Sequence, residues 1–443
     1  MRLIHTIPLV TCALAQVNDD AFAAAKSGDL YNLRKLRQAN WKANNPKATD
    51  GWRKTALHYA AEYDHADVAD SLINHDGLMK MQDYKGRNAL MLAAQKGNSR
   101  IIKNMVKYCE SDQSACTGTD DRDRNALHYA ANNGQFHVIK DLAKLFVGSE
   151  SDRDDDGRTA LMLAVVKNHV LAVEEFLAIP SVKNTALSVF DSSGMNVLHL
   201  AFRYGHLDVL HSLIRKLHIT RNHLQAVDQK GRNIFHLSAM SGNSEAMLEV
   251  LLEKDLSNRM GRLESYLFQT DSRGDTPVHY IFRYGDLALF NAIKSSIGNI
   301  WKAVVFVNDK TGETPVHSLF RLPSVGYAEI IENGEKYPTS KVAMMMDLFH
   351  GLGQDDYAHG LQMFKHSFNV EDKLGYTPLL RAVEYGDFSV VREIVNELDT
   401  AENKGTYKSA IGQFRGSLNF RINILSVNFK ELVLILQFIK SDR

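Results

Sequence analysis

The sequence predicts an all-α fold in which helix–turn–helix units stack as a solenoid, with short β-turn or hairpin fingers between the units. Three observations predict it. A seven-residue phrase recurs nine times, a turn of common layout precedes most copies, and an apolar helical stripe follows several of them. Recurrence at a period of roughly 20–50 residues is the signature of a repeat array, in which each unit packs on its neighbours.

The recurring phrase starts with Thr or Asn and continues with mainly apolar residues. Its copies are TALHYAA (55–61), NALMLAA (88–94), NALHYAA (125–131), TALMLAV (159–165), NVLHLAF (196–202), NIFHLSA (233–239), TPVHYIF (276–282), TPVHSLF (314–320) and TPLLRAV (377–383). Successive copies start 33–43 residues apart, except the last, which follows after 63. One unit of this length buries too little apolar surface to be stable alone. We therefore expect neighbouring units to share a core.

The turn before each copy explains why a helix starts there. In DYKGRN (83–88), Asp can bond its own backbone two residues on, Gly supplies a positive φ, and Asn caps the helix. The first turn (50–55) has its Gly displaced, and the third (120–125) has none. The second helix of each unit is predicted by segments such as GHLDVLHSLI (205–214), whose apolar residues lie on one stripe at helical spacing.

This pattern resembles the ankyrin repeat, a D-x-x-G-x turn followed by TPLHxAA, then xxGH and an apolar helix. The resemblance covers roughly residues 50–398, and residues 20–38 look like a first half-unit. It implies a row of projecting turns beside a concave helical face. It also implies that the His of each phrase tethers its own turn to the next by hydrogen bonds. These tethers are His58, His128, His199, His236, His279 and His317, while Leu380 takes the place in the last copy.

We expect five regions along the chain. They are a signal peptide or disordered leader (1–16), the main repeat array (17–320), an insertion or degenerate repeat (321–371), the last clear repeat (372–398) and a C-terminal cap or tail (399–443). The leader has a basic Arg2, a short apolar stretch and a small-residue site before Gln16, which favours a secreted or lumenal protein. A frayed leader on a cytoplasmic protein is the alternative.

Composition and motifs favour binding over catalysis. The 52 basic and 52 acidic residues leave no net charge, unlike a nucleic-acid binder with its basic stripe. No apolar window is long enough to span a membrane. We find no nucleotide, hydrolase or metal motif, so we expect no enzyme, cofactor or metal. Residues 152–157 resemble the opening of a calcium loop, but the twelfth position is Leu163 instead of a bidentate Glu, so an acidic surface loop is preferred.

The three cysteines give no disulfide framework. Six residues separate Cys109 from Cys116. We expect two thiols there, with a local disulfide as the alternative, because bridge geometry cannot be judged from sequence.

The predicted function is that of a monomeric scaffold that binds a protein partner through its concave face and fingers. Tyr and Arg are enriched at interface hot spots, and several share a phase just after the phrase: Arg203, Tyr63, Tyr204, Arg283, Tyr284 and Tyr385. The finger-tip candidates are Trp52, Arg53, Tyr84, Lys85, Gln229, Lys230, Ser272 and Arg273. The tyrosines could instead be structural spacers between helices. The alternative function is a targeting arm that carries a small enzymatic or regulatory insertion at 321–371.

Overall fold

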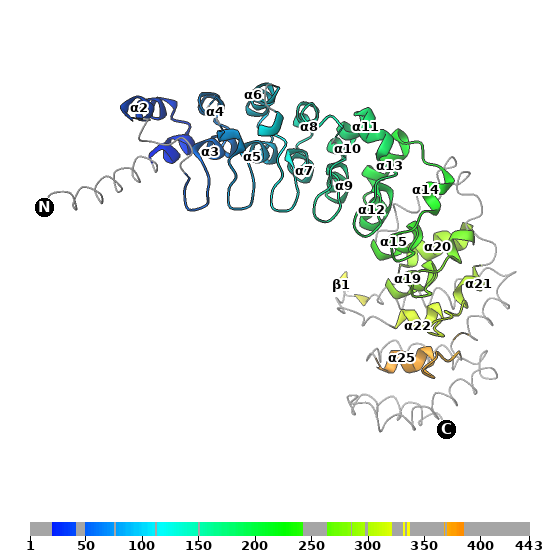
Figure 1. Ribbon diagram of the computed structural model, residues 1–443. Coiled ribbons are helices and arrows are strands. Elements are labelled where there is room, and N and C mark those ends of the chain that lie inside the picture. The colour runs from blue at the N-terminus through cyan, green and yellow to red at the C-terminus, as the bar shows by residue number, and fades with distance from the viewer. Residues whose placement is uncertain are drawn as a thin grey trace, which may run out of the picture. The chain divides into compact units, whose positions relative to one another are not determined.

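The chain forms two compact units. Unit 1 consists of Met1–Ala201 and His206–His218, and unit 2 of Phe202–Gly205 and Ile219–Arg443. The computed structural model describes residues 20–40, 49–74, 77–110, 113–148, 151–241, 264–284, 286–296, 300–320, 331–332, 335–336, 367 and 370–384. Both units consist of stacked short helices, which confirms the predicted all-α repeat fold (Figure 1).

Unit 1 has two layers of helices. The inner layer stacks in the order α3 (Ala56–Glu62), α5 (Ala89–Lys96), α7 (Ala126–Asn132) and α9 (Ala160–Val166). The outer layer follows α2 (Leu30–Asn40), α4 (Ala66–Ile73), α6 (Ser99–Cys109), α8 (Phe136–Ala143), α10 (Val170–Leu177) and α13 (Leu207–Lys216). Shorter elements complete the unit: a helical segment at 20–27, η1 (Leu78–Lys80), η2 (Gln113–Ala115) and α11 (Pro180–Thr185). Helix α12 (Val197–Tyr204) crosses the boundary between the units.

Unit 2 repeats the inner stack with α15 (Ile234–Ser241), α19 (Pro277–Tyr284), α22 (Pro315–Leu319) and α25 (Pro378–Glu384). Its other elements are α14 (Arg221–Gln225), α18 (Glu264–Leu267), α20 (Leu287–Ser296), α21 (Trp301–Val304) and an antiparallel pair of two-residue strands, β1 (Ile331–Glu332) and β2 (Glu335–Lys336). Helices α22 and α25 are direct neighbours in the stack although 63 residues separate the starts of their phrases.

The phrase residues form the core because helical spacing brings most of them between neighbouring helices. Leu57, Leu90 and Leu127 are almost completely buried. The last phrase position is a buried Ala in α5, α7 and α15, whereas two later copies fill it with the buried rings of Phe282 and Phe320. Each inner helix starts at the Thr or Asn that opens its phrase. Asn88 Oδ1, for example, accepts the Met91 N–H at 2.9 Å, which satisfies a donor that the helix leaves unpaired.

The fingers share a backbone geometry that requires a positive φ at their fourth residue. Gly supplies it in most fingers, as at Gly86 (φ 75). Where the sequence lacks that Gly, Arg53 (φ 58) and Asp123 (φ 57) adopt the same conformation. One finger differs from the predicted layout. Asn308, not Asp309, opens it, because Asn308 Oδ1 accepts the Lys310 and Thr311 N–H groups.

Adjacent fingers are joined by backbone hydrogen bonds at their tips. The carbonyl of the third finger residue accepts the N–H of the second residue of the next finger. In unit 1 these bonds run from Tyr84 N to Trp52 O (3.0 Å), Asp121 N to Lys85 O (3.2 Å), Asp155 N to Arg122 O (3.0 Å) and Ser192 N to Asp156 O (3.0 Å). In unit 2, Ser272 N donates to Lys230 O at 2.7 Å, and Lys373 N donates at 2.8 Å to the carbonyl of Thr311, which is the fourth residue of the finger that Asn308 opens. The tips of each unit are therefore held in register with their neighbours.

This register predicts that Gly157→Ala destabilises the protein more than Gly148→Ala does. Both glycines have positive φ, so both substitutions cost about 1–2 kcal/mol of backbone strain. A Cβ at Gly157 would also lie 2.7 Å from the Ser192 backbone N, whereas at Gly148 nothing lies within 4 Å. The backbone of the next finger cannot yield without breaking its hydrogen bond, so we expect about 1–3 kcal/mol of further loss at Gly157. Urea unfolding followed by circular dichroism measures both, and equal losses would contradict the finger register.

Candidate protein-binding surface

The first residue of each finger fixes the finger to its own unit. The Asp83 Oδ1 atom accepts the Lys85 and Arg87 N–H groups at 2.9 Å each, and Oδ2 accepts Arg87 Nε at 2.8 Å. In other fingers a tyrosine of the following helix completes this arrangement, as when Tyr129 donates its hydroxyl to Asp120 Oδ2 at 2.6 Å. Every oxygen of these buried carboxylates is occupied, so the finger tips project from a fixed base.

Five of the predicted tether histidines connect their own helix cap to the next finger. The Nε2 atoms contact the carbonyl oxygen of the residue just before the next helix cap. The pairs are His58 with Arg87 (3.0 Å), His128 with Arg158 (3.1 Å), His236 with Asp275 (3.1 Å), His279 with Glu313 (3.2 Å) and His317 with Tyr376 (3.0 Å). His199 is also fully buried, and its Nδ1 accepts the Asn196 N–H at 3.3 Å.

The partners of the His58 ring define its tautomer. In His58, Nδ1 faces the Thr55 backbone N–H at 3.1 Å, a group that can only donate, so Nδ1 is the acceptor. The Nε2 atom faces a carbonyl oxygen, which can only accept, so Nε2 carries the hydrogen. The ring is therefore neutral in the fold. Burial lowers the pKa of His58 to about 4, against the opposing effect of the carbonyl contact. Burial lowers the pKa of His236, His279 and His317 to about 4 in the same way.

The predicted finger-tip residues lie at the surface. Trp52 is 59% exposed and Tyr84 is 44% exposed, and their ring centroids are 5.1 Å apart. Trp52 therefore contacts the next finger instead of folding back on its own repeat. The Lys85 ammonium lies 5.3 Å from the Tyr84 ring centroid. Arg53 and, in unit 2, Lys230 are exposed as well.

The predicted tyrosine positions at the ends of the inner helices are also surface positions. Tyr63 is 52% exposed, with its ring 6.4 Å from that of Tyr59. In unit 2, Tyr204 and Tyr284 are 40% and 39% exposed. This exposure favours a contact role over a buried spacer, although partner binding stays a prediction. Tyr385 lies outside the described residues.

The structure corrects the prediction for Arg283. This side chain is buried, and its Nη2 atom pairs with Asp275 Oδ2 at 2.6 Å while the guanidinium lies 5.0 Å from the Tyr280 ring centroid. It fixes the base of its own finger and is not available to a partner. Arg203, at the same phase, is half-buried with Nη1 3.8 Å from Met240 Sδ.

The acidic finger tips of unit 1 were not among the predicted contact residues. Asp121, Asp155 and Asp156 are exposed at the same second and third finger positions as Tyr84 and Lys85. The interpretation as ordinary surface loops overlooked this shared phase, which is the signal that could have identified them.

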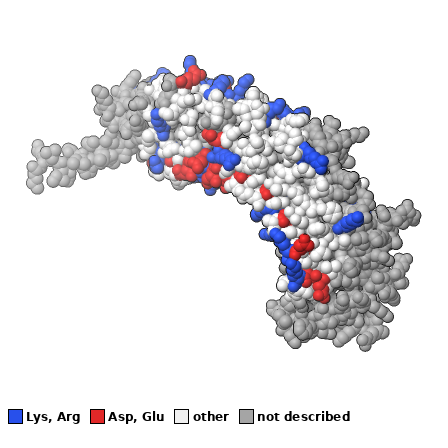
Figure 2. Space-filling model, turned by 45° about the vertical axis from the view of Figure 1, so that its right-hand side comes forward, with Lys and Arg blue, Asp and Glu red and all other residues white. Residues whose placement is uncertain are grey.

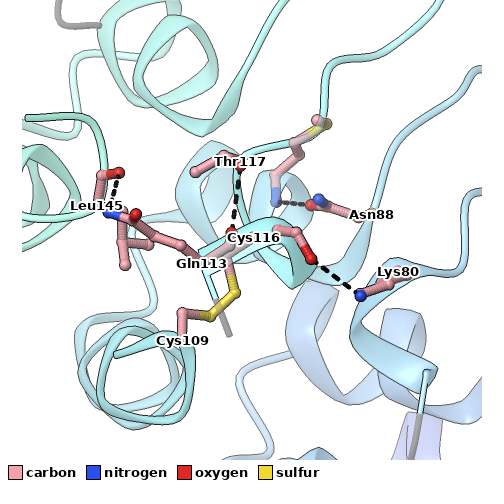
Figure 3. Close-up of a disulfide and its surroundings, with 9 residues drawn as sticks. Lys80, Asn88, Cys109, Gln113, Cys116, Thr117 and Leu145 are labelled. Atoms are coloured by element: carbon pink, nitrogen blue, oxygen red, sulfur yellow. Dashed lines mark hydrogen bonds between the residues drawn. A yellow bond between two sulfur atoms is a disulfide. The ribbon is translucent and has the colours of Figure 1, made fainter. Parts of the chain in front are cut away.

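The structure also corrects the prediction of two thiols. Cys109 and Cys116 form a disulfide, with their Cα atoms 6.1 Å apart (Figure 3). Cys109 ends α6, and the short η2 turn brings Cys116 back, since the Cys116 N–H donates to the Gln113 carbonyl at 3.0 Å. The Lys80 ammonium donates to Ser114 Oγ at 3.0 Å and fixes the same turn. Both cysteines are buried.

The acidic run at 152–157 forms a finger in the structure. The carboxylates of Asp154, Asp155 and Asp156 approach within 4.8 Å of one another, as exposed acidic groups often do without an ion. Asp154 Oδ1 already accepts the backbone N–H of Asp156 and of Arg158, at 3.1 and 2.7 Å. Among the described residues, no helix has the length and apolar character needed to cross a membrane.

Comparison with known proteins identifies the repeats. A family model described as ankyrin repeats (3 copies) matches residues 21–115, 109–186 and 127–223. The probable E3 ubiquitin-protein ligase XBOS32 of Oryza sativa subsp. japonica is 30% identical over 86 residues, which is 19% of this chain and 17% of that protein. XBOS31 of the same plant, also a probable E3 ubiquitin-protein ligase, is 32% identical over 98 residues, 22% of each chain. Inversin of Mus musculus is 36% identical over 84 residues, 19% of this chain and 8% of that protein.

The buried histidines predict that stability falls as the pH is lowered from about 6.5 towards 4. In this window the unfolded chain protonates these rings, with a pKa near 6.5, while the folded chain keeps them neutral. The unfolded state then binds more protons, so each histidine contributes a slope of up to about 1.4 kcal/mol per pH unit. Above about pH 6.5 these rings are neutral in both the folded and the unfolded chain, so their titration no longer lowers the stability. Urea unfolding at about pH 7, 6 and 5 measures this, and equal stability at all three would contradict the neutral tethers.

Proposed function

Because the chain is an ankyrin-repeat protein, we propose that it is a non-enzymatic scaffold that binds another protein through its finger tips and the adjoining ends of its inner helices. Ankyrin repeats serve in general as protein-interaction surfaces. The identity of the partner is not part of this proposal, because the fold hosts many.

One observation supports the proposal above the others: large aromatic side chains are exposed on a rigid frame. Trp52, Tyr63 and Tyr84 are each more than 40% exposed within the first two repeats of unit 1. Aromatic anchors of this kind dominate the binding energy of many interfaces. The fingers that bear Trp52 and Tyr84 are bonded to each other and anchored at their bases, so little conformational entropy is lost when a partner docks.

The names of the relatives do not extend this proposal to catalysis. The chain spans about a fifth or less of the length of the two ligases and of inversin, so their activities belong to those whole proteins. The alternative of an enzymatic or regulatory insertion at 321–371 falls mainly outside the described residues. It remains a prediction.

We also propose that the protein works in an oxidising compartment, either secreted or lumenal. The Cys109–Cys116 disulfide supports this, because such bridges persist outside the reducing cytosol. The leader at 1–16 supports it independently. A cytoplasmic location remains the competing proposal.

The scaffold proposal predicts that a partner is lost when the exposed aromatics are removed. The full chain is immobilised and exposed to an extract of the source organism, and captured proteins are identified by mass spectrometry. We expect the double variant Trp52→Ala, Tyr63→Ala to lose at least one protein that the wild type captures. Each truncated anchor should cost about 1–2 kcal/mol of binding free energy.

Tyr31→Ala is the matched control for this experiment. Tyr31 is 75% exposed but lies on the outer helix α2, away from the fingers. It should capture the same proteins as the wild type. Identical captured sets for all three proteins would contradict a role for the aromatic surface.

The compartment proposal predicts that the natural mature protein begins at Gln16 and contains an oxidised Cys109–Cys116 pair. N-terminal sequencing and peptide mass mapping without reductant measure the two features. An intact Met1 or Arg2, together with two alkylatable thiols, would place the protein in a reducing compartment.

A further inference from the structure

The first two fingers of unit 1 display an aromatic pair. Trp52 and Tyr84 expose more than two fifths of their surfaces, although burying such rings normally stabilises a fold. The Tyr84 N–H to Trp52 O bond keeps the two residues adjacent, with ring centroids 5.1 Å apart and planes inclined at 51°. The pair is therefore a fixed apolar feature with aromatic faces open to solvent.

The next two fingers carry an excess of negative charge. Residues 120–124 and 152–158 contain seven Asp and four Arg. Part of this charge is neutralised inside the third finger, where Arg124 pairs with the buried Asp120 at 2.8 Å. In the fourth finger, Arg158 instead approaches the exposed Asp156 at 3.7 Å. Figure 2 shows acidic side chains gathered on unit 1 beside a smaller basic group.

The aspartates of the fourth finger also affect the pKa of Asp154. Burial raises the pKa of the Asp154 carboxyl, and the nearby Asp156 and Asp155 raise it further. By contrast, the pKa of Asp83 is lowered, because hydrogen bonds from Arg87 outweigh the effect of burial. The negative charge of the fourth finger is thus less compensated than that of the second.

A cation already occupies part of the aromatic surface. The Lys85 ammonium lies 5.3 Å from the Tyr84 ring centroid, within the range in which a ring face attracts a positive charge. Aromatic faces followed by carboxylates along one row of bonded fingers form a surface complementary to positive charge. Lys85 and the exposed Arg53, which directly follows Trp52, both oppose an incoming cation at the aromatic pair.

From these observations we propose that the first four fingers of unit 1 bind a basic, extended segment of a protein partner. One Arg or Lys of that segment packs on the Trp52–Tyr84 pair, and further basic side chains pair with Asp121, Asp155 and Asp156. The proposal rests on the scaffold function and specifies the chemistry of the segment that it recognises.

The test uses two labelled twelve-residue peptides, one of alternating Arg and Ser and the other of alternating Glu and Ser. Fluorescence polarisation measures their binding to the full chain at low salt. We expect the Arg peptide to bind at least about tenfold more tightly than the Glu peptide. Its affinity should fall as salt is raised, because exposed charges are screened.

Three substitutions give expected changes of different sign. Trp52→Ala should weaken Arg-peptide binding by about tenfold through loss of the aromatic anchor. Asp156→Asn should weaken it by about two- to fivefold. Lys85→Ala should strengthen it by about two- to fivefold, because it removes a like charge and frees the Tyr84 ring. Circular dichroism and urea unfolding verify that each variant is folded.

Asp208→Asn and Tyr31→Ala are the matched controls. Asp208 and Tyr31 are exposed on the outer helices α13 and α2, away from the fingers, so both variants should bind the Arg peptide as the wild type does. Undetectable Arg-peptide binding at about 1 mM, equal binding of the two peptides, or wild-type affinity in Trp52→Ala and Asp156→Asn would each overturn the proposal.

The outcome is separable from that of the scaffold proposal. If extract capture still depends on Trp52 and Tyr63 while the Arg peptide fails to bind, the basic-segment inference is wrong and the scaffold stands. If capture is also independent of these residues, both proposals fall.

Discussion

The structure depends on one repeated interaction, a buried neutral histidine that bridges its own helix cap and the finger of the next repeat. Its Nδ1 accepts a backbone N–H within the repeat, and its Nε2–H reaches a carbonyl that begins the following repeat, as in His58 and Arg87. A charged ring carries a hydrogen on Nδ1 as well as on Nε2, so its Nδ1 could not accept the backbone N–H bond. Both bonds together therefore require a neutral ring. The same burial that stabilises the stack therefore fixes the protonation state.

The fingers present side chains to solvent from a backbone that hydrogen bonds hold in place. Their bases are anchored by the carboxylate or amide oxygen of the opening residue, as at Asp83, and most of their tips are bonded to the next finger. Side chains at the second and third finger positions face solvent, and they differ between fingers because the backbone, not these side chains, makes the tip bonds. Trp52, Lys85 and Asp156 occupy the equivalent third finger position with different chemistry. Recognition can thus change from finger to finger without loss of the fold.

Much of this architecture could be predicted from sequence because it is local. The Thr or Asn caps, the phrase periodicity and the phase of His58 or His236 follow from short-range spacing. Side chains whose environment depends on how the chain folds back within a repeat were not predictable. Arg283 shares its phase with Arg203, yet Asp275 pairs with it inside the fold. Likewise, Cys109 and Cys116 form a bridge only because the η2 turn reverses the chain between them.

Fingers without glycine show where pattern matching fails on physical grounds. The sequence of the first and third fingers departs from the common turn, but Arg53 and Asp123 still adopt the left-handed conformation. The hydrogen bonds to the Asp that opens each of these fingers, together with the tip bonds to the neighbouring finger, hold that geometry and offset a strain of about 1–2 kcal/mol per residue. The low propensity of Arg and Asp for the left-handed conformation is offset here by hydrogen bonds that the sequence of a single turn does not predict.

The most direct measurement of this account is the protonation state of the tether histidines in the folded protein. Long-range nitrogen–proton NMR correlation, with rings assigned by single His→Gln variants, reports both ring nitrogens. The account predicts an unprotonated Nδ1 and a protonated Nε2 in His58, His236, His279 and His317, unchanged from neutral pH down to about pH 5. Rings that titrate near their ordinary pKa of about 6.5, or that carry the proton on Nδ1, would contradict it.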